Sequence, residues 1–168
     1  YRFYHDLLSC PELGKTAQKY GYEICYFPHF NMMATNDYFE DVENIRLIED
    51  GREYKKYFSE AALWITDYSS TAFDFAYLGK PVVYCQSDKK EFFGSHTYTE
   101  GYFDYEKDGF GEVVYDVDSA VSTICDYMKN DCKIKDKYSE RIDNTFAYRD
   151  RNNSLRVTEA IKERVNEK

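Results

Sequence analysis

Blocks of apolar and polar residues alternate along the chain in a way that predicts strands and helices in turn. Nearly unbroken apolar runs, which are typical of parallel strands buried on both faces, cover 62–66 and 82–85. The β-rich runs 22–27 and 45–48 stop at a proline and before an Asp-Gly pair, and 113–115 is a further candidate. We therefore expect these segments to be the parallel strands of one sheet.

Apolar residues at helical spacing separate and follow the strands. Pro11 and Gly21 mark the ends of the first helix, because proline fits the first helical turn and glycine the position after the last. Residues 86–111 are too polar and irregular to assign. The alternation predicts one α/β domain over 1–168, a Rossmann-like parallel sheet with helices on both faces. The other expected helices cover 53–60, 72–77, a stretch from Asp116 or Asp118 to Met128, 136–146 and 154–165.

The composition indicates a folded domain and limits what the chain can bind. Hydrophobic residues make up 43% and charged residues 32% of the 168 positions, which is typical of a folded domain. Lys and Arg total 22 against 31 Asp and Glu, and the resulting charge of −9 disfavours nucleic acid. No apolar run approaches the roughly 20 residues that span a bilayer. The cysteines form no close pair, so we expect reduced thiols rather than a zinc or redox site.

A candidate ligand site follows the strand expected at 62–66. Ligands of open parallel sheets bind at the carboxyl ends of the strands, where the N–H groups of a helix start favour an anion. The segment from Asp67 to Thr71 occupies this place, and the hydroxyls of Ser69, Ser70 and Thr71 suit a diphosphate. An ordinary serine cap on a helix that binds nothing is the alternative interpretation.

Other polar residues lie at related positions. His29 follows the strand at 22–27, and an imidazole at this edge could neutralise or protonate a leaving phosphate, although a surface histidine is the alternative. Asp74 lies one turn into the next helix, where it either accepts ribose hydroxyls or only interacts with the helix dipole. We interpret the acidic stretch 104–108 as a solvated turn, so no metal site is expected.

The motifs around the candidate site resemble those of a known family. Residues 65–70, 73–76 and 79–82 read ITDYSS, FDFA and GKPV. This order resembles the signature of the CDP-glycerol glycerophosphotransferases, which make teichoic acids and related capsular polymers. The pattern departs from the family at Phe30, where proline is frequent, and at 110–112, which suggests a subgroup with a different acceptor. Further similar segments are 27–29, 101–106, 109–112, Asp150, Asn153, Ser154 and Arg156.

The resemblance implies an architecture and a reaction. The chain would be the C-terminal, donor-binding half of a GT-B enzyme, whose first strand and N-terminal acceptor domain lie outside the sequence. A hydroxyl of a lipid-linked polyol-phosphate or saccharide acceptor would attack the β-phosphorus of CDP-glycerol and release CMP. The isolated chain would be inactive. The enzyme would need no metal or other cofactor, and it would act at the inner face of the cell membrane through contacts made by its missing parts.

The resemblance also implies roles for individual residues. His29 would act in catalysis at the leaving phosphate. The other assignments are donor phosphate binding for Ser69, Ser70, Thr71 and Asp67, and ribose or cytidine binding for Asp74 and Glu112.

Two alternative functions remain. One is a GT-B glycosyltransferase that uses a nucleotide sugar, because the start of a helix binds either diphosphate. The other is a non-catalytic nucleotide-binding domain.

Overall fold

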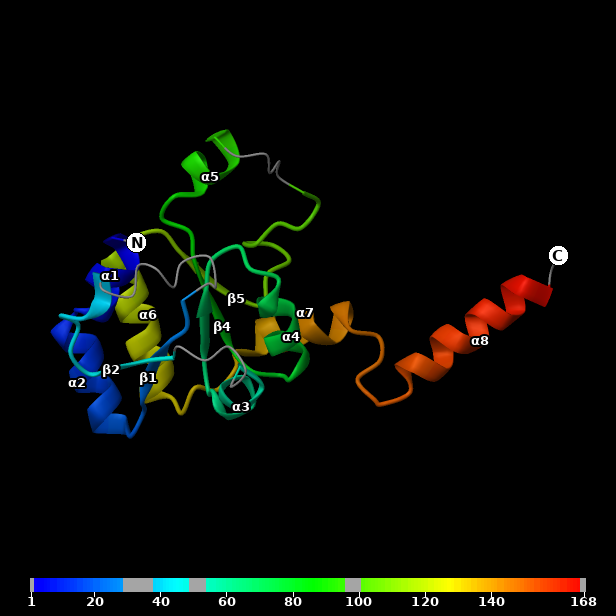
Figure 1. The fold of residues 1–168 in the computed structure, drawn as a ribbon, viewed down its shortest axis with the longest axis horizontal. Helices are drawn as coiled ribbons and strands as arrows, with labels where there is room; N and C mark the ends of the chain where they lie inside the picture. The colour runs from blue at the N-terminus through cyan, green and yellow to red at the C-terminus, as the bar shows by residue number, and fades with distance from the viewer. Residues whose placement is uncertain (1, 29–37, 49–53, 96–100, 167–168) are drawn as a thin grey trace.

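The computed structural model describes residues 2–28, 38–48, 54–95 and 101–166 (Figure 1). The expected strands and helices are all present, with bounds that differ from the prediction by a few residues. The strands are β1 (Ile24–Tyr26), β2 (Ile45–Leu47), β3 (Trp64–Thr66), β4 (Val82–Cys85) and β5 (Gly111–Val114). The helices are α1 (Arg2–Leu8), α2 (Pro11–Tyr20), α3 (Tyr54–Glu60), α4 (Thr71–Tyr77), α5 (Lys89–Ser95), α6 (Val117–Lys129), α7 (Asp136–Thr145) and α8 (Asn153–Asn166).

Local sequence signals determine several helix ends. α2 ends at Gly21, whose φ of 76° is a left-handed conformation that glycine adopts without strain. α6 begins after Asp116, whose carboxylate accepts a hydrogen bond of 2.8 Å from the backbone N–H of Ser119. Asp116, rather than Asp118, is therefore the cap of this helix.

The strands are all parallel, but their hydrogen bonds divide them into two sheets where the sequence predicts one. β1 pairs with β2, and the second sheet has the order β3-β4-β5. β1 and β3 are only three residues long, which limits the ladder that each can form. Ile24 of β1 and Ile65 of β3 nevertheless pack against the same hydrophobic cluster. The two sheets therefore share one core.

Side chains of β4, the fully buried strand, alternate between two layers of helices. Val83 and Cys85 belong to the core that α1, α2 and α6 cover, whereas Val82 and Tyr84 pack in a second cluster with Phe75 of α4. Helices thus lie on both faces of the sheet (Figure 1). The Rossmann-like α/β class predicted from the sequence is confirmed, and its alternating connections place the carboxyl ends of the strands at one edge.

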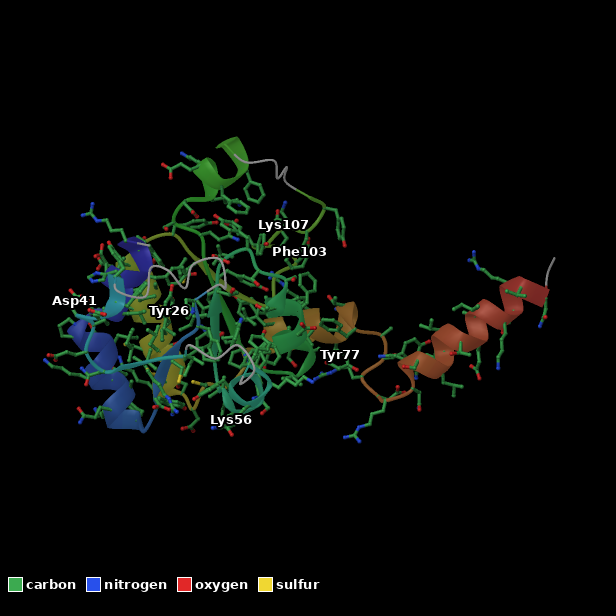
Figure 2. All side chains as sticks on the ribbon, in the orientation of Figure 1. Tyr26, Asp41, Lys56, Tyr77, Phe103 and Lys107 are labelled. Carbon is green, nitrogen blue, oxygen red and sulfur yellow. The ribbon has the colours of Figure 1, made fainter. Side chains whose placement is uncertain are left out.

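The helix at the C-terminal end of the described chain, α8, extends away from the rest of the structure (Figures 1 and 2). None of its residues is buried, and its apolar side chains Leu155, Val157, Ile161 and Val165 are 56% to 66% exposed. Among the described residues, neither α8 nor any other helix has the length and apolar composition needed to cross a membrane.

Candidate functional site

The turn predicted to bind phosphate, residues 67–71, connects the carboxyl end of β3 to the start of α4. The backbone N–H of Tyr68 donates a hydrogen bond of 2.7 Å to the carboxylate of Asp67, and this bond holds the chain as it leaves the strand. Thr66, the last residue of β3, lies opposite Tyr84 of β4. The turn therefore lies at the strand-end edge, beside the end of β4.

The hydroxyls of Ser69 and Thr71 already have partners within the chain. The backbone N–H of Thr71 donates to Ser69 Oγ at 3.3 Å, and the two hydroxyls lie 3.0 Å apart. Trp64 Nε1 of β3 donates to Thr71 Oγ1 at 3.2 Å. Ser69 therefore satisfies an N–H group at the helix start, as in the simple capping interpretation, and Thr71 connects the turn to the strand.

Ser70 is the exposed hydroxyl of the turn. It occupies the N-cap position of α4, yet its side chain makes no capping hydrogen bond. No other hydrogen bond to this hydroxyl occurs among the described residues. Of the three hydroxyl residues in the turn, Ser70 is thus the one whose side chain is available to a ligand without loss of an internal bond.

Aromatic residues on both sides of the turn in the sequence hold it in place. The ring of Tyr68 stacks on Phe92 of α5, with centroids 3.9 Å apart and planes 9° apart. The Tyr68 hydroxyl donates to Asp88 at 3.0 Å, and the Tyr105 hydroxyl donates to the Tyr68 carbonyl at 3.3 Å. Tyr105 and Phe92 lie in the stretch that has no clear hydrophobic period. Tyr105 belongs to the segment 101–106 that resembles the family, whereas only the pair of rings in FF could have indicated Phe92.

Burial and the charge of Asp67 keep the groups around the turn protonated. Burial raises the pKa of Cys85 to about 12, with a further contribution from Asp67, so this thiol is not a nucleophile at neutral pH. Burial also raises the pKa of Tyr68 and that of Tyr105, again with a contribution from Asp67. These tyrosine hydroxyls therefore remain hydrogen-bond donors across the physiological range.

Asp74 lies on the exposed face of α4 and lines a surface hollow of about 450 Å³. Phe73 and Tyr77 of the same helix, the end of α7 with the segment that follows it, and the first residue of α8 form the rest of its wall. The Tyr77 hydroxyl donates to the carbonyl of Tyr148 at 3.2 Å and lies between α4 and that segment (Figure 2). A carboxylate beside aromatic walls is a suitable environment for a nucleoside, whose ribose hydroxyls donate to carboxylates.

The closing motif forms an ion pair beside this hollow. Arg156 Nη1 of α8 donates to the Asp150 carboxylate at 2.9 Å, and its guanidinium lies 3.8 Å from the centroid of the Tyr148 ring. The hydrogen bond from Arg156 lowers the pKa of Asp150 to about 2. Asn153 also contacts Arg156 and lines the hollow. The motif therefore orders the segment between α7 and α8.

Glu112 lies apart from the other predicted site residues. It stands opposite Val83 in the β4-β5 register, and its carboxylate accepts a hydrogen bond of 2.6 Å from the hydroxyl of Tyr127 on α6. Lys135 Nζ lies 2.6 Å from the same carboxylate. Glu112 thus faces the α6 side of the sheet, whereas Asp74 belongs to α4 on the other side. The structure does not bring these two residues together.

The last two predicted features are His29 and the acidic stretch 104–108. His29 lies outside the described residues. In the acidic stretch, the Asp104 carboxylate accepts from the backbone N–H groups of Glu106 at 3.0 Å and Lys107 at 3.1 Å, and Lys107 lowers its pKa. Within the described ranges, no three His, Cys, Asp or Glu side chains are grouped so that they could hold a metal ion.

The sequence also matches a described protein family over almost its whole length. Residues 4–163 match the family CDP-Glycerol:Poly(glycerophosphate) glycerophosphotransferase. The chain belongs to this family. The turn at 67–71 and the closing motif both lie inside the matched range.

Two known proteins are similar to the chain over nearly all of its length. It is 39% identical over 165 residues to the "Minor teichoic acid biosynthesis protein GgaB" of Bacillus subtilis (strain 168), covering 98% of this chain but 18% of that protein. It is also similar in structure to the wall teichoic acid polymerase TagF, with a TM-score of 0.67 and 21% identity, covering 96% of this chain and 38% of that one. The structural similarity confirms the predicted Rossmann-like fold of the GT-B type. The position of this domain within a longer enzyme stays a prediction.

Proposed function

We propose that the complete protein transfers glycerol phosphate from CDP-glycerol to a hydroxyl of a lipid-linked polyol-phosphate or saccharide acceptor, and that this chain binds the donor. Family membership supports the reaction class. One observation on the chain itself supports donor binding, namely the open hydroxyl of Ser70 on a turn between a parallel strand and a helix start. We also propose that the chain is the C-terminal half of the enzyme, and that its N-terminal domain supplies the acceptor site and the membrane contact.

The proposed reaction is a phosphoryl transfer without a covalent enzyme intermediate. The oxygen of the acceptor hydroxyl attacks the β-phosphorus of CDP-glycerol, and the bond from that phosphorus to the bridging oxygen breaks. The acceptor loses its proton, and CMP leaves with the bridging oxygen. Charge therefore accumulates on the leaving phosphate, so hydrogen-bond donors held at that position stabilise the transition state.

Most of the predicted site residues have separate roles in this proposal. Ser70 donates to a donor phosphate, while Ser69 and Thr71 hold the helix start in the geometry that presents its N–H groups. His29 neutralises or protonates the leaving phosphate. Asp74, in the hollow beside α4, accepts the ribose hydroxyls. We do not extend the proposal to Glu112, because Tyr127 and Lys135 already bind its carboxylate on the other face of the sheet.

Calorimetry with a panel of nucleotides tests the donor assignment. We expect the complete protein to bind CDP-glycerol and CMP more tightly than UDP-glucose, with CDP-ribitol showing whether the polyol matters. A clear preference for UDP-glucose would replace the proposal with the nucleotide-sugar glycosyltransferase. A protein that binds CDP-glycerol but releases no CMP with any acceptor would be the non-catalytic nucleotide-binding alternative.

A further inference from the structure

Gln86 carries a buried side-chain amide without a hydrogen-bond partner. The residue directly follows β4, and its backbone N–H donates to the Val114 carbonyl of β5 at 2.8 Å. Its exposed fraction is 1%, and neither its side-chain nitrogen nor its side-chain oxygen has a partner among the described residues. Because buried amides are nearly always paired in folded proteins, this one indicates a partner other than the residues that the structure describes.

The alternation of β4 gives the direction of this side chain. Gln86 continues the series of Val82 and Tyr84, which face the α4 side of the sheet. On that side, the ring of Tyr105 lies 5.1 Å from the ring of Tyr84, and the Tyr105 hydroxyl binds the carbonyl of Tyr68. The amide is therefore on the same face as α4 and the aromatic cluster that holds the 67–71 turn.

The residues next to Gln86 in the sequence interact with this turn. Its predecessor, Cys85, is near enough to Asp67 for that carboxylate to raise the pKa of the thiol. Two residues after it, Asp88 accepts the hydrogen bond from the hydroxyl of Tyr68. Gln86 thus lies between a residue that Asp67 influences electrostatically and a residue that binds Tyr68, at the carboxyl end of the strand next to β3.

We propose that the Gln86 amide binds the nucleotide donor through a pair of hydrogen bonds, one donated by Nε2 and one accepted by Oε1. This inference rests on the proposed function, since it concerns the same donor site. A matching group offers an acceptor and a donor side by side, as the nucleoside and the two free hydroxyls of glycerol both do. An ionised phosphate offers acceptors only and leaves Oε1 unpaired. In the complex the amide turns toward the strand-end edge, a rotamer change of the kind that accompanies many binding events.

The substitution Gln86→Met in the complete protein tests this proposal. Methionine has a similar length and flexibility but neither forms nor needs the two hydrogen bonds. We expect the affinity for CDP-glycerol to fall about tenfold, which corresponds to the loss of two neutral hydrogen bonds. We expect the melting temperature of the free protein to stay the same or rise, because a buried unpaired amide is removed. Gln18→Met, on the exposed surface of α2, is the control and should change neither quantity.

The choice of ligand shows which part of the donor Gln86 binds. A loss of affinity for both CDP and CDP-glycerol assigns the amide to the nucleoside, whereas a loss for CDP-glycerol alone assigns it to the glycerol unit. Unchanged affinity for both, together with a lower melting temperature, would overturn the proposal and make Gln86 a structural residue bound to internal water.

A second variant covers the case in which Gln86→Met does not fold. Gln86→Glu keeps the size of the side chain and retains a donor only while its carboxyl is protonated. Its affinity for CDP-glycerol should fall as the pH rises through the titration of that carboxyl, and a pH-independent affinity equal to that of the unaltered protein would also overturn the proposal. Failure of the unaltered protein to bind CDP-glycerol would instead overturn the proposed function itself.

Discussion

Ser69 and Ser70 are neighbours with the same side chain, yet we expect one hydroxyl to stabilise the helix start and the other to bind the donor. Ser69 Oγ accepts the backbone N–H of Thr71, whereas the Ser70 hydroxyl has no partner among the described residues. Replacing each serine with alanine therefore separates a role in folding from a role in binding.

The expected magnitudes follow from these contacts. Ser69→Ala removes a capping bond and should lower the free energy of unfolding by about 1 kcal/mol. Ser70→Ala breaks no internal bond, so its effect on the free energy of unfolding should stay within about 0.5 kcal/mol. If Ser70 donates to a donor phosphate, Ser70→Ala loses a hydrogen bond to a charged group, worth about 1.5–3 kcal/mol, and affinity for CDP-glycerol falls roughly 10- to 150-fold.

Urea unfolding and calorimetry with CDP-glycerol measure the two effects on the complete protein. Ser122→Ala, at an exposed position on α6, is the matched control and should leave stability and affinity unchanged. Full affinity in Ser70→Ala would show that this hydroxyl does not bind the donor, and the turn would then be an ordinary helix cap. An equal loss of stability in both variants would show that Ser70 also has a structural partner.

Three further substitutions test the roles of His29, Asp150 and Tyr127. His29→Ala should lower turnover more than donor affinity, and steady-state rates that match those of the unaltered protein would exclude a catalytic role. Asp150→Asn removes a carboxyl whose pKa Arg156 lowers to about 2 from 3.8. The stability that this depressed pKa contributes is present above the pKa of the unfolded state and is lost as the pH falls through the pKa of the folded state. The free energy of unfolding of the variant should therefore depend less on pH between about 4 and 2. Tyr127→Phe should lower the free energy of unfolding by about 1–2 kcal/mol, because Glu112 loses a donor, without changing affinity for CDP-glycerol. Reduced affinity in that variant would place Glu112 in the donor site after all.

The elements that could be predicted are those with a strong hydrophobic period or a marked end. β4 and α2 belong to this group, since one is an apolar run and the other lies between Pro11 and Gly21. α1 and α5 were not predicted, and α5 lies within the polar, irregular stretch 86–111 that could not be assigned. α1 nevertheless contributes Leu7, only 1% exposed, to the core. Tertiary packing rather than local pattern decides such short helices.

The place of the candidate site could be predicted, but its internal hydrogen bonds could not. Sequence order alone puts 67–71 between a buried strand and a helix start. Whether Ser69 or Ser70 accepts the N–H of Thr71 depends on backbone angles, and Ser70, the apparent cap, adopts a helical φ of −63° and leaves that bond to Ser69. The stacking of Tyr68 on Phe92 joins residues far apart in sequence, which no local pattern reveals.

The position of Glu112 in the sheet depends on the residue at which β5 begins. The hydrophobic run starts at Val113, so the sequence suggests that Glu112 lies in a loop. The structure extends β5 back to Gly111, where a Cβ atom would lie 1.6 Å from the Val82 carbonyl oxygen and only glycine fits. Within the strand, alternation turns Glu112 toward α6. Because the strand begins two residues before the apolar run, Glu112 is a strand residue whose side of the sheet is fixed by alternation.

The most direct test of the central claim is CMP release by the complete protein, measured with CDP-glycerol and a lipid-linked polyol-phosphate acceptor. We expect one CMP for each glycerol phosphate added to the acceptor, with turnover reduced when donor binding is weakened by Ser70→Ala. Tight binding of CDP-glycerol with no CMP formed, whichever acceptor is supplied, would contradict it.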